Sequence, residues 1–292
     1  MKFTRLSCPA PAKLNLFLHV TGRRADGYHL LQTLFRFIDL HDTLHFDLRD
    51  DGVVRRSNAV DGVDEDQDLC VRAARLLQSE TGCRLGVNIG LEKRIPMGGG
   101  LGGGSSDAAT TLLALNRLWS LGLSREKLME LGLRLGADVP VFVFGASAFA
   151  EGVGEKLQEF PLPATWYVVL FPEVHVPTAK IFMQSELTRD SVSITMRALS
   201  IGQTDHPSDL SKSQLRNDLQ SVVCKLYPEV ARHISLLSAF GAAMMTGSGA
   251  CVFAEFATCE TAHNALRELQ EKYQTRGIVT QGLVAHPLHD WV

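Results

Sequence analysis

The sequence predicts an α+β protein built from two mixed halves. Alternating apolar and polar residues dominate the first hundred positions, which is typical of strands, and helical patterns follow a glycine-rich stretch. After a proline-rich interruption at 160–164, helices and strands alternate again, and each half carries a glycine turn. We therefore place the domain boundary at the interruption, with an N-terminal domain over 1–163 and a C-terminal domain over 164–292.

The first hundred residues predict a sheet with one helix. Alternation indicates strands at 11–20, 34–40, 43–48 and 85–91, and an amphipathic pattern indicates a helix over 68–80. Several short alternating segments separated by turns pair most simply as an antiparallel sheet.

The glycine-rich stretch from Pro96 to Ala109 is the most informative feature of the chain. Six glycines in seven residues run into a pair of serines, which predicts a helix capped by Ser105 or Ser106 and ending near Leu121. Glycines let a backbone approach an anion closely, and a helix start offers unpaired N–H groups and the positive end of the dipole. The stretch therefore predicts a cradle for a polyphosphate.

Three other interpretations of the glycines fit less well. A Walker A loop needs a lysine after its second conserved glycine, and Gly103 is followed by Gly104 instead. A dinucleotide-binding turn needs a strand leading straight into it and a second strand ending in an acidic residue, but Pro96 precedes the glycines and no such strand follows. A flexible linker would not be joined directly to an apolar helix.

The rest of the chain predicts further helices and strands around two turns. A second helix begins at Ser124 and runs to Leu135, before the break at 136–140. In the second half, 166–172 has the pattern of a strand, and 202–213 that of an exposed polar loop. A glycine turn at 246–250 precedes the apolar run 251–254.

Composition excludes several classes of function. With 292 residues, 45% apolar and 21% charged, the chain can bury a core, and its net charge of −3 gives no electrostatic footprint for nucleic acid or an anionic membrane. No leader pattern and no uncharged apolar run of membrane-spanning length are present, so we expect a cytoplasmic protein. The six cysteines form no Cys-x-x-Cys pair and are expected as reduced thiols. His41 and His45 lie in a strand-like segment and do not predict a metal site.

Lys13 and Asp138 are the candidates for chemistry. Transfer of a phosphoryl group needs a cation near that group and a carboxylate for the hydroxyl proton. Lys13 lies in an otherwise apolar strand, and Asp138 directly precedes a buried apolar segment. Taken alone, Lys13 could simply lie on the polar face of its strand, and Asp138 could be a turn residue.

Four separated motifs resemble those of the GHMP small-molecule kinases, named for galactokinase, homoserine, mevalonate and phosphomevalonate kinases. They are found, in the family's order, at 11–15, 96–109, 136–140 and 246–250. The segment 24–29 and the extended glycine run resemble the branch that acts on a cytidine diphosphate-linked methylerythritol. The resemblance implies an N-terminal domain similar to ribosomal protein S5 domain 2 and a C-terminal ferredoxin-like domain, with the active site in the cleft.

The resemblance also implies a reaction and a set of site residues. ATP, accompanied by Mg²⁺, would phosphorylate the 2-hydroxyl of that small-molecule substrate in the non-mevalonate route to isoprenoids. Lys13 would stabilise developing negative charge, and Asp138 would receive or orient the hydroxyl proton. The ATP phosphates would contact Pro96, Met97, Gly98, Gly99, Gly100, Leu101, Gly102, Gly103, Gly104, Ser105 and Ser106, with Mg²⁺ near Ser106. The substrate would contact Asn15, Tyr28, His29, Thr178 and Phe182.

Other functions remain open at this stage. A related kinase for another alcohol, such as homoserine or mevalonate, would share the fold and the mechanism. A non-catalytic nucleotide or sugar binder would keep the fold, although the presence of both Lys13 and Asp138 counts against it. A dehydrogenase is disfavoured by the missing strand and acidic residue. The sequence does not indicate an oligomeric state.

Overall fold

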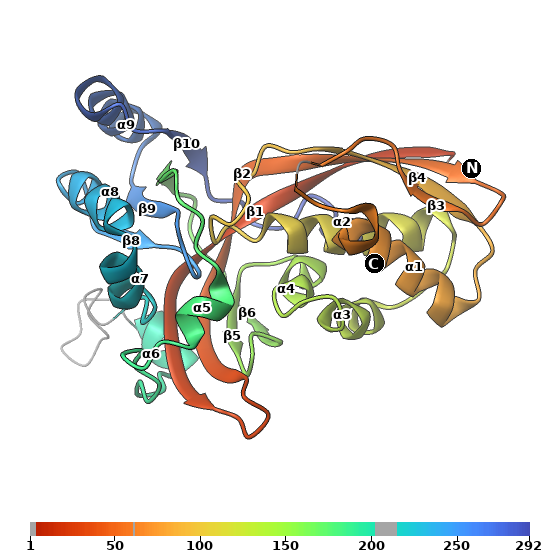
Figure 1. Ribbon diagram of the computed structural model, residues 1–292, viewed down its shortest axis with the longest axis horizontal. Coiled ribbons are helices and arrows are strands. Elements are labelled where there is room, and N and C mark those ends of the chain that lie inside the picture. Colours follow the sequence, from red (N-terminus) through yellow and green to blue (C-terminus); the bar gives the residue numbers. More distant parts are fainter. Residues whose placement is uncertain (1–3, 61, 202–214) are drawn as a thin grey trace.

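The computed structural model describes residues 4–60, 62–201 and 215–292 and confirms a mixed α/β architecture. The smaller sheet lies at one end of an elongated molecule, and the long strands of the larger sheet run from the other end toward it (Figure 1). The larger one has the strand order β3-β4-β2-β5-β6, with β1 paired to β2, and the smaller one has the order β10-β7-β9-β8. The predicted polar loop at 202–213 falls outside the described residues.

The larger sheet is organised by two long antiparallel strands, β1 (Arg5–Arg23) and β2 (His29–Arg49). The segments 34–40 and 43–48, predicted as two strands, form one, because His41 and Asp42 between them continue the pairing with β1 and a bulge at 39–40 absorbs the shift in register. The shorter strands of this sheet are β3 (Val54–Arg56), β4 (Gly86–Glu92), β5 (Ala148–Glu151) and β6 (Lys156–Glu159).

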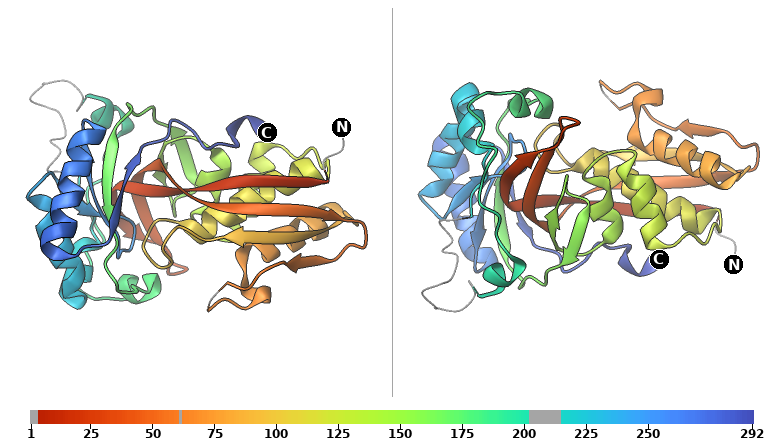
Figure 2. Two further views of the ribbon diagram at one scale, coloured as in Figure 1. Left: turned by 90° about the horizontal axis from the view of Figure 1, so that it is seen from above. Right: turned by 90° about the horizontal axis from the view of Figure 1, so that it is seen from below.

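Four helices cover one face of the larger sheet and enclose the main core. They are α1 (Leu69–Thr81), α2 (Gly103–Leu118), α3 (Arg125–Leu133) and α4 (Val139–Phe144), and the short 3-10 turn η1 (Glu65–Gln67) precedes α1. Helix α2 is buried along most of its length and runs under β1 and β2 (Figure 2). It is therefore a rigid support for whatever its N-terminus faces.

The second half packs helices on the smaller sheet. Its strands are β7 (Trp166–Leu170), β8 (Ala243–Met245), β9 (Val252–Phe256) and β10 (Gly277–Gln281), and its helices are α5 (Thr178–Phe182), α6 (Met196–Ile201), α7 (Gln220–Leu226), α8 (Pro228–Ser238) and α9 (Cys259–Tyr273). A separate apolar cluster, which includes Leu14, Leu101 and Tyr167, joins the two halves.

The chain returns to the first half after β10. Gly282 bridges Ile38, the Leu283 amide donates to the Phe37 carbonyl, and the chain ends in the 3-10 turn η3 (His289–Trp291). Leu288 belongs to the main core of the first half. The last eleven residues thus tie the second half to the first.

Two further observations concern the cysteines and the helices. All six cysteines are free thiols, as predicted. None of the helices in the described ranges combines the length and apolarity needed to cross a bilayer.

Candidate active site

A cavity of about 730 Å³ lies between the glycine stretch and the second half of the chain. Its lining brings together most of the predicted site residues: Lys13, Asn15, all of 96–105, Asp138, Thr178 and Phe182. Ser106, Tyr28 and His29, which the structure also describes, lie outside the lining. The cavity therefore gathers segments of both halves around the start of α2.

The glycines at 98–103 are required chiefly by contacts within the protein. At Gly100, where φ is 76°, an added Cβ would lie 2.2 Å from the Thr246 carbonyl oxygen. The loop packs this closely because the Cys251 amide donates to the Gly99 carbonyl at 3.0 Å. Gly104 differs: it is exposed to the cavity, and its Cβ would meet nothing closer than Leu69 at 3.6 Å. Of these glycines, Gly104 is the one that leaves space for a ligand.

Helix α2 starts at Gly103, at least three residues earlier than the predicted caps Ser105 or Ser106 imply. Gly102 occupies the N-cap position with φ of 74°, a left-handed conformation that glycine adopts without strain. Because glycine has no side chain to accept hydrogen bonds from the first amides, these N–H groups remain available to an anion. The predicted caps Ser105 and Ser106 lie inside the first turn.

The two serines have different environments. Ser105 is partly exposed and lines the cavity. Ser106 is fully buried, and its hydroxyl donates to the Pro11 carbonyl at 2.7 Å, which fastens α2 to β1. The hydroxyl available to a ligand at this helix start is thus that of Ser105.

Lys13 and Asp138 meet inside the cavity. The Lys13 side chain is 3% exposed, so Lys13 does not lie on a solvated strand face, and its Nζ is 3.5 Å from Oδ2 of Asp138. The same ammonium donates to the Gly100 carbonyl at 3.0 Å and to Oδ1 of Asn15 at 2.5 Å. Asp138 is the N-cap residue of α4, makes no side-chain cap bond and is 38% exposed, which leaves its carboxylate open to the cavity. A cation and an accessible carboxylate therefore face one space.

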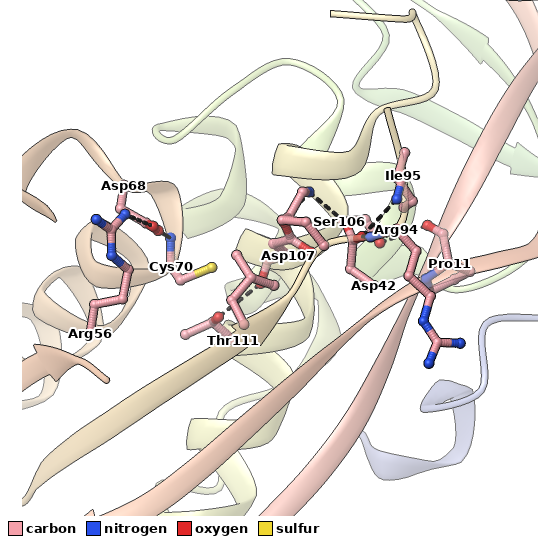
Figure 3. A network of polar contacts seen from close by, with 12 residues as sticks. Pro11, Asp42, Arg56, Asp68, Cys70, Arg94, Ile95, Ser106, Asp107 and Thr111 are labelled. Carbon is pink, nitrogen blue, oxygen red and sulfur yellow. Dashed lines mark hydrogen bonds and ion pairs between the residues drawn. The ribbon is translucent and has the colours of Figure 1, made fainter. Parts of the chain in front are cut away.

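A second charged cluster, which sequence patterns did not predict, lies at the edge of the cavity. Lys93 donates to Oδ2 of Asp107 at 2.9 Å and to Oδ2 of Asp42 at 2.5 Å. Oδ1 of Asp42 accepts from the amides of Arg94 and Ile95, directly before the glycine stretch (Figure 3). Asp42 thus anchors the chain that leads into the glycine stretch.

Burial governs the ionisation of this cluster. Desolvation raises the pKa of Asp107 to about 7, although the nearby Lys93 opposes the rise. Burial lowers the pKa of Lys93, but the two carboxylates outweigh this and raise it above its usual value. Asp42 went unrecognised because it falls between two predicted strands, where an aspartate resembles a turn residue; in the continuous strand β2 it is fully buried.

The opposite wall of the cavity carries Thr178 and Phe182. The Thr178 and Ser248 hydroxyls are 2.7 Å apart, so α5 contacts the second glycine turn. Phe182 stacks on His29 with ring centroids 4.8 Å apart. Nε of Arg189 donates to Nε2 of His29 at 3.1 Å, and burial, Arg189 and Arg23 all lower the pKa of His29. The His29 imidazole is therefore held as a neutral acceptor beside Phe182. The neighbouring residue Tyr28 is 63% exposed.

Comparisons with known proteins agree with this geometry. The family model described as the GHMP kinases N terminal domain matches residues 68–146, and the model described as GHMP kinases C terminal matches 201–275. The chain belongs to the GHMP kinase family. This GHMP kinase is 61% identical to the 4-diphosphocytidyl-2-C-methyl-D-erythritol kinase of Nitrosospira multiformis, over 98% of the chain and 94% of the relative. It is 60% identical to the same-named protein of Thiobacillus denitrificans, over 97% of the chain and 98% of the relative.

Solved structures support the same assignment. A crystal structure of 4-(cytidine 5'-diphospho)-2C-methyl-D-erythritol kinase matches this GHMP kinase with a TM-score of 0.78 and 35% identity, covering 95% of the chain and 100% of that structure. The homoserine kinase of Cytophaga hutchinsonii matches with a TM-score of 0.69 and 17% identity, over 98% of the chain and 96% of that structure. The second match shows a shared fold alone.

Proposed function

We propose that this GHMP kinase transfers the γ-phosphoryl group of ATP to the 2-hydroxyl of 4-diphosphocytidyl-2-C-methyl-D-erythritol, giving the 2-phosphate and ADP. The reaction belongs to the non-mevalonate route of isoprenoid precursor biosynthesis. The observation that carries the proposal is the meeting of Lys13 and Asp138, 3.5 Å apart, in the cavity that the start of α2 also faces. Its substrate rests on the names of the full-length relatives.

The start of α2 would hold the phosphates of ATP. Its free amides and dipole favour an anion, and Gly104 lets the nucleotide approach the backbone. Lys13 would sit beside the transferred phosphoryl group and stabilise the charge that builds up there. Asp138 would take the proton of the 2-hydroxyl while the hydroxyl oxygen forms its bond to the γ-phosphorus. The bond between the γ-phosphorus and the leaving oxygen of ADP breaks in the same step. These roles need no movement of Lys13 toward Asp138.

The cytidine end would use the wall around α5. Phe182 already has a ring partner in His29 on one side, so we propose that the base stacks against the part of Phe182 that lines the cavity. Stacking of this kind contributes about 1 to 3 kcal/mol per base in nucleic-acid complexes. Tyr28 lies outside the cavity lining and would have to turn toward the substrate on binding.

Mg²⁺ would accompany the nucleotide. Within the described ranges, no group of three or more His, Cys, Asp or Glu side chains is arranged to hold a metal ion. We therefore propose that phosphate oxygens carry the ion, with Ser105 as the exposed hydroxyl nearby, and that Mg²⁺ neutralises phosphate charge. Ser106 is fully buried and lies outside the cavity lining, so a role for it would require the start of α2 to open.

The test is ADP release with Mg-ATP and the cytidine substrate, run beside homoserine and mevalonate. Turnover restricted to the cytidine substrate, and abolished in Asp138→Asn, is the expected result. Asn retains a short polar side chain at the N-cap of α4, and Asp66→Asn, at a side chain 77% exposed outside the cavity, is the matched control. Turnover with homoserine or mevalonate instead would reassign the substrate, and absence of turnover with all three would favour a binding protein.

A further inference from the structure

Thr33 lies where the pairing between β1 and β2 breaks. Asn15 pairs with Phe35 and Leu18 pairs with Thr33, so two residues of β1 oppose one residue of β2 in a bulge. Phe17, inside this bulge, is fully buried, and the Thr33 hydroxyl donates to its carbonyl oxygen at 2.5 Å. The Thr33 side chain thus supplies a hydrogen bond to the Phe17 carbonyl, which has no partner in the pairing between β1 and β2.

That bond fixes the direction of the next one. A threonine hydroxyl has a single hydrogen, and at Thr33 this hydrogen is directed at the Phe17 carbonyl. Toward Asn15 the hydroxyl can therefore only accept, and Nδ2 of Asn15 donates to it at 2.9 Å. A reversed Asn15 amide would place two acceptors against each other here.

The other end of the Asn15 amide faces Lys13. With Nδ2 directed at Thr33, Oδ1 accepts from the Lys13 ammonium at 2.5 Å. A reversed amide would set its NH₂ group against the ammonium, and two donors repel each other. Both contacts select the same orientation, and the backbone amide of Asn15 is also held, because it donates to the Thr246 hydroxyl at 2.9 Å.

The result is a directed ammonium. Lys13 has three N–H bonds; one is given to Asn15 and one to the Gly100 carbonyl. The remaining donor is on the side of Asp138, 3.5 Å from its carboxylate, in the cavity. A transferred phosphoryl group would meet this third N–H.

We propose that Thr33 is a positioning residue for phosphoryl transfer: its hydroxyl sets the orientation of the Asn15 amide, and that amide holds the third N–H of Lys13 toward the reacting phosphate. The inference rests on the proposed kinase function. It also changes the role of Asn15, which acts through Lys13 rather than as a substrate contact.

Thr33→Val tests the hydroxyl, since valine has the shape of threonine without the donor or the acceptor. Loss of one orienting hydrogen bond is expected to lower kcat about tenfold and to leave KM for ATP and for the cytidine substrate within about twofold. Thr33→Ser keeps the hydroxyl and is expected to restore most of the rate. A purely structural role would lower the yield of folded protein without separating kcat from KM in this way.

A double-mutant cycle with Asn15→Ala tests the route of the effect. If Thr33 acts only through Asn15, adding Thr33→Val to Asn15→Ala lowers kcat no further. Additive losses of kcat, a change confined to KM, or an unchanged Thr33→Val enzyme would each overturn the inference. If Thr33→Val does not fold, Thr33→Cys, a weaker donor of similar volume, replaces it in the same cycle.

The wild-type enzyme separates this inference from the proposed function. Absence of turnover in the wild type would refute the proposed function itself. Turnover in the wild type with the same rate in all Thr33 variants would refute only the positioning role.

Discussion

At the scale of single residues, the proposed mechanism depends most on the buried ammonium of Lys13, which would stabilise the charge on the transferred phosphoryl group. Its side chain is 3% exposed and is held by Asn15, Gly100 and Asp138. Lys13→Met keeps the length and removes the charge, so we expect kcat to fall by about 100-fold or more, as when one preorganised stabiliser of transition-state charge is lost. Steady-state kinetics with each substrate varied in turn measures this. A fall confined to KM would assign Lys13 to ground-state binding.

Two glycines of the same loop are expected to respond differently to alanine. Gly104→Ala should leave folding intact or slightly improved, because alanine favours a helix over glycine by about 0.5 to 1 kcal/mol, while its methyl group enters the cavity and raises KM for ATP. Gly100→Ala should destabilise the protein, because its Cβ would lie 2.2 Å from the Thr246 carbonyl oxygen at a positive φ.

Thermal denaturation and ATP kinetics on the two glycine variants form the check. Equal loss of stability in both would contradict the division of the loop into packing glycines and a ligand-facing glycine. The number of glycines could be seen in the sequence, but the reason for each could not, since Gly98 depends on contact with His175 and Gly100 on contact with Thr246, both far along the chain.

At the scale of elements, we expect the last segment of the chain to lose stability in acid through His286. Nδ1 of His286 accepts from the Leu288 amide at 3.0 Å, while Nε2 is buried without a hydrogen-bond partner among the described residues. Burial, aided by Arg125 and His289, lowers the pKa of His286 from 6.5 to about 3. The folded state therefore binds fewer protons than the unfolded state between these values, so stability is lost as the pH falls below about 6.5.

His286→Asn is expected to lose less stability than the wild type between pH 7 and pH 4, because asparagine offers a neutral acceptor and does not titrate. Urea denaturation at a series of pH values gives the free energy of unfolding for both proteins. Parallel pH profiles would show that His286 is not the group that titrates.

The elements themselves were largely predictable from local patterns, whereas the charged cluster of the site was not. Helix α3 begins after Ser124 as predicted, because a capping residue acts within its own turn. The predicted start of α2 was wrong, because Gly102 at positive φ turns the chain into the helix before the serines. Asp42 lies in β2, Lys93 in the segment after β4, and Asp107 in α2, with Lys93 51 positions after Asp42 and 14 before Asp107. Only the folded strand β2 brings them together.

At the scale of the whole molecule, the two halves must keep a fixed relation, because the cavity takes residues from both. Arg125, at the start of α3, links the end of α4 to the end of the chain. Its guanidinium donates to the carbonyls of Val143 and Phe144 at 2.8 Å, to the main-chain oxygen of Val292 at 2.8 Å, and to the His289 carbonyl. The helix held in this way carries Asp138 at its other end.

Arg125→Met should therefore affect both stability and catalysis. Four backbone oxygens lose their shared donor, but of these residues only Val143 is fully buried. An unsatisfied buried acceptor costs about 1 to 3 kcal/mol, so we expect a loss of about that size in the free energy of unfolding. Arg125→Lys keeps the charge but replaces the planar guanidinium with a single ammonium group, so it should recover only part of the lost free energy of unfolding. At temperatures where the variant remains folded, kcat should fall more than KM changes, since α4 positions the carboxylate that takes the hydroxyl proton. An Arg125→Met enzyme that is less stable but has the wild-type kcat would show that α4 keeps Asp138 in place without the C-terminal segment.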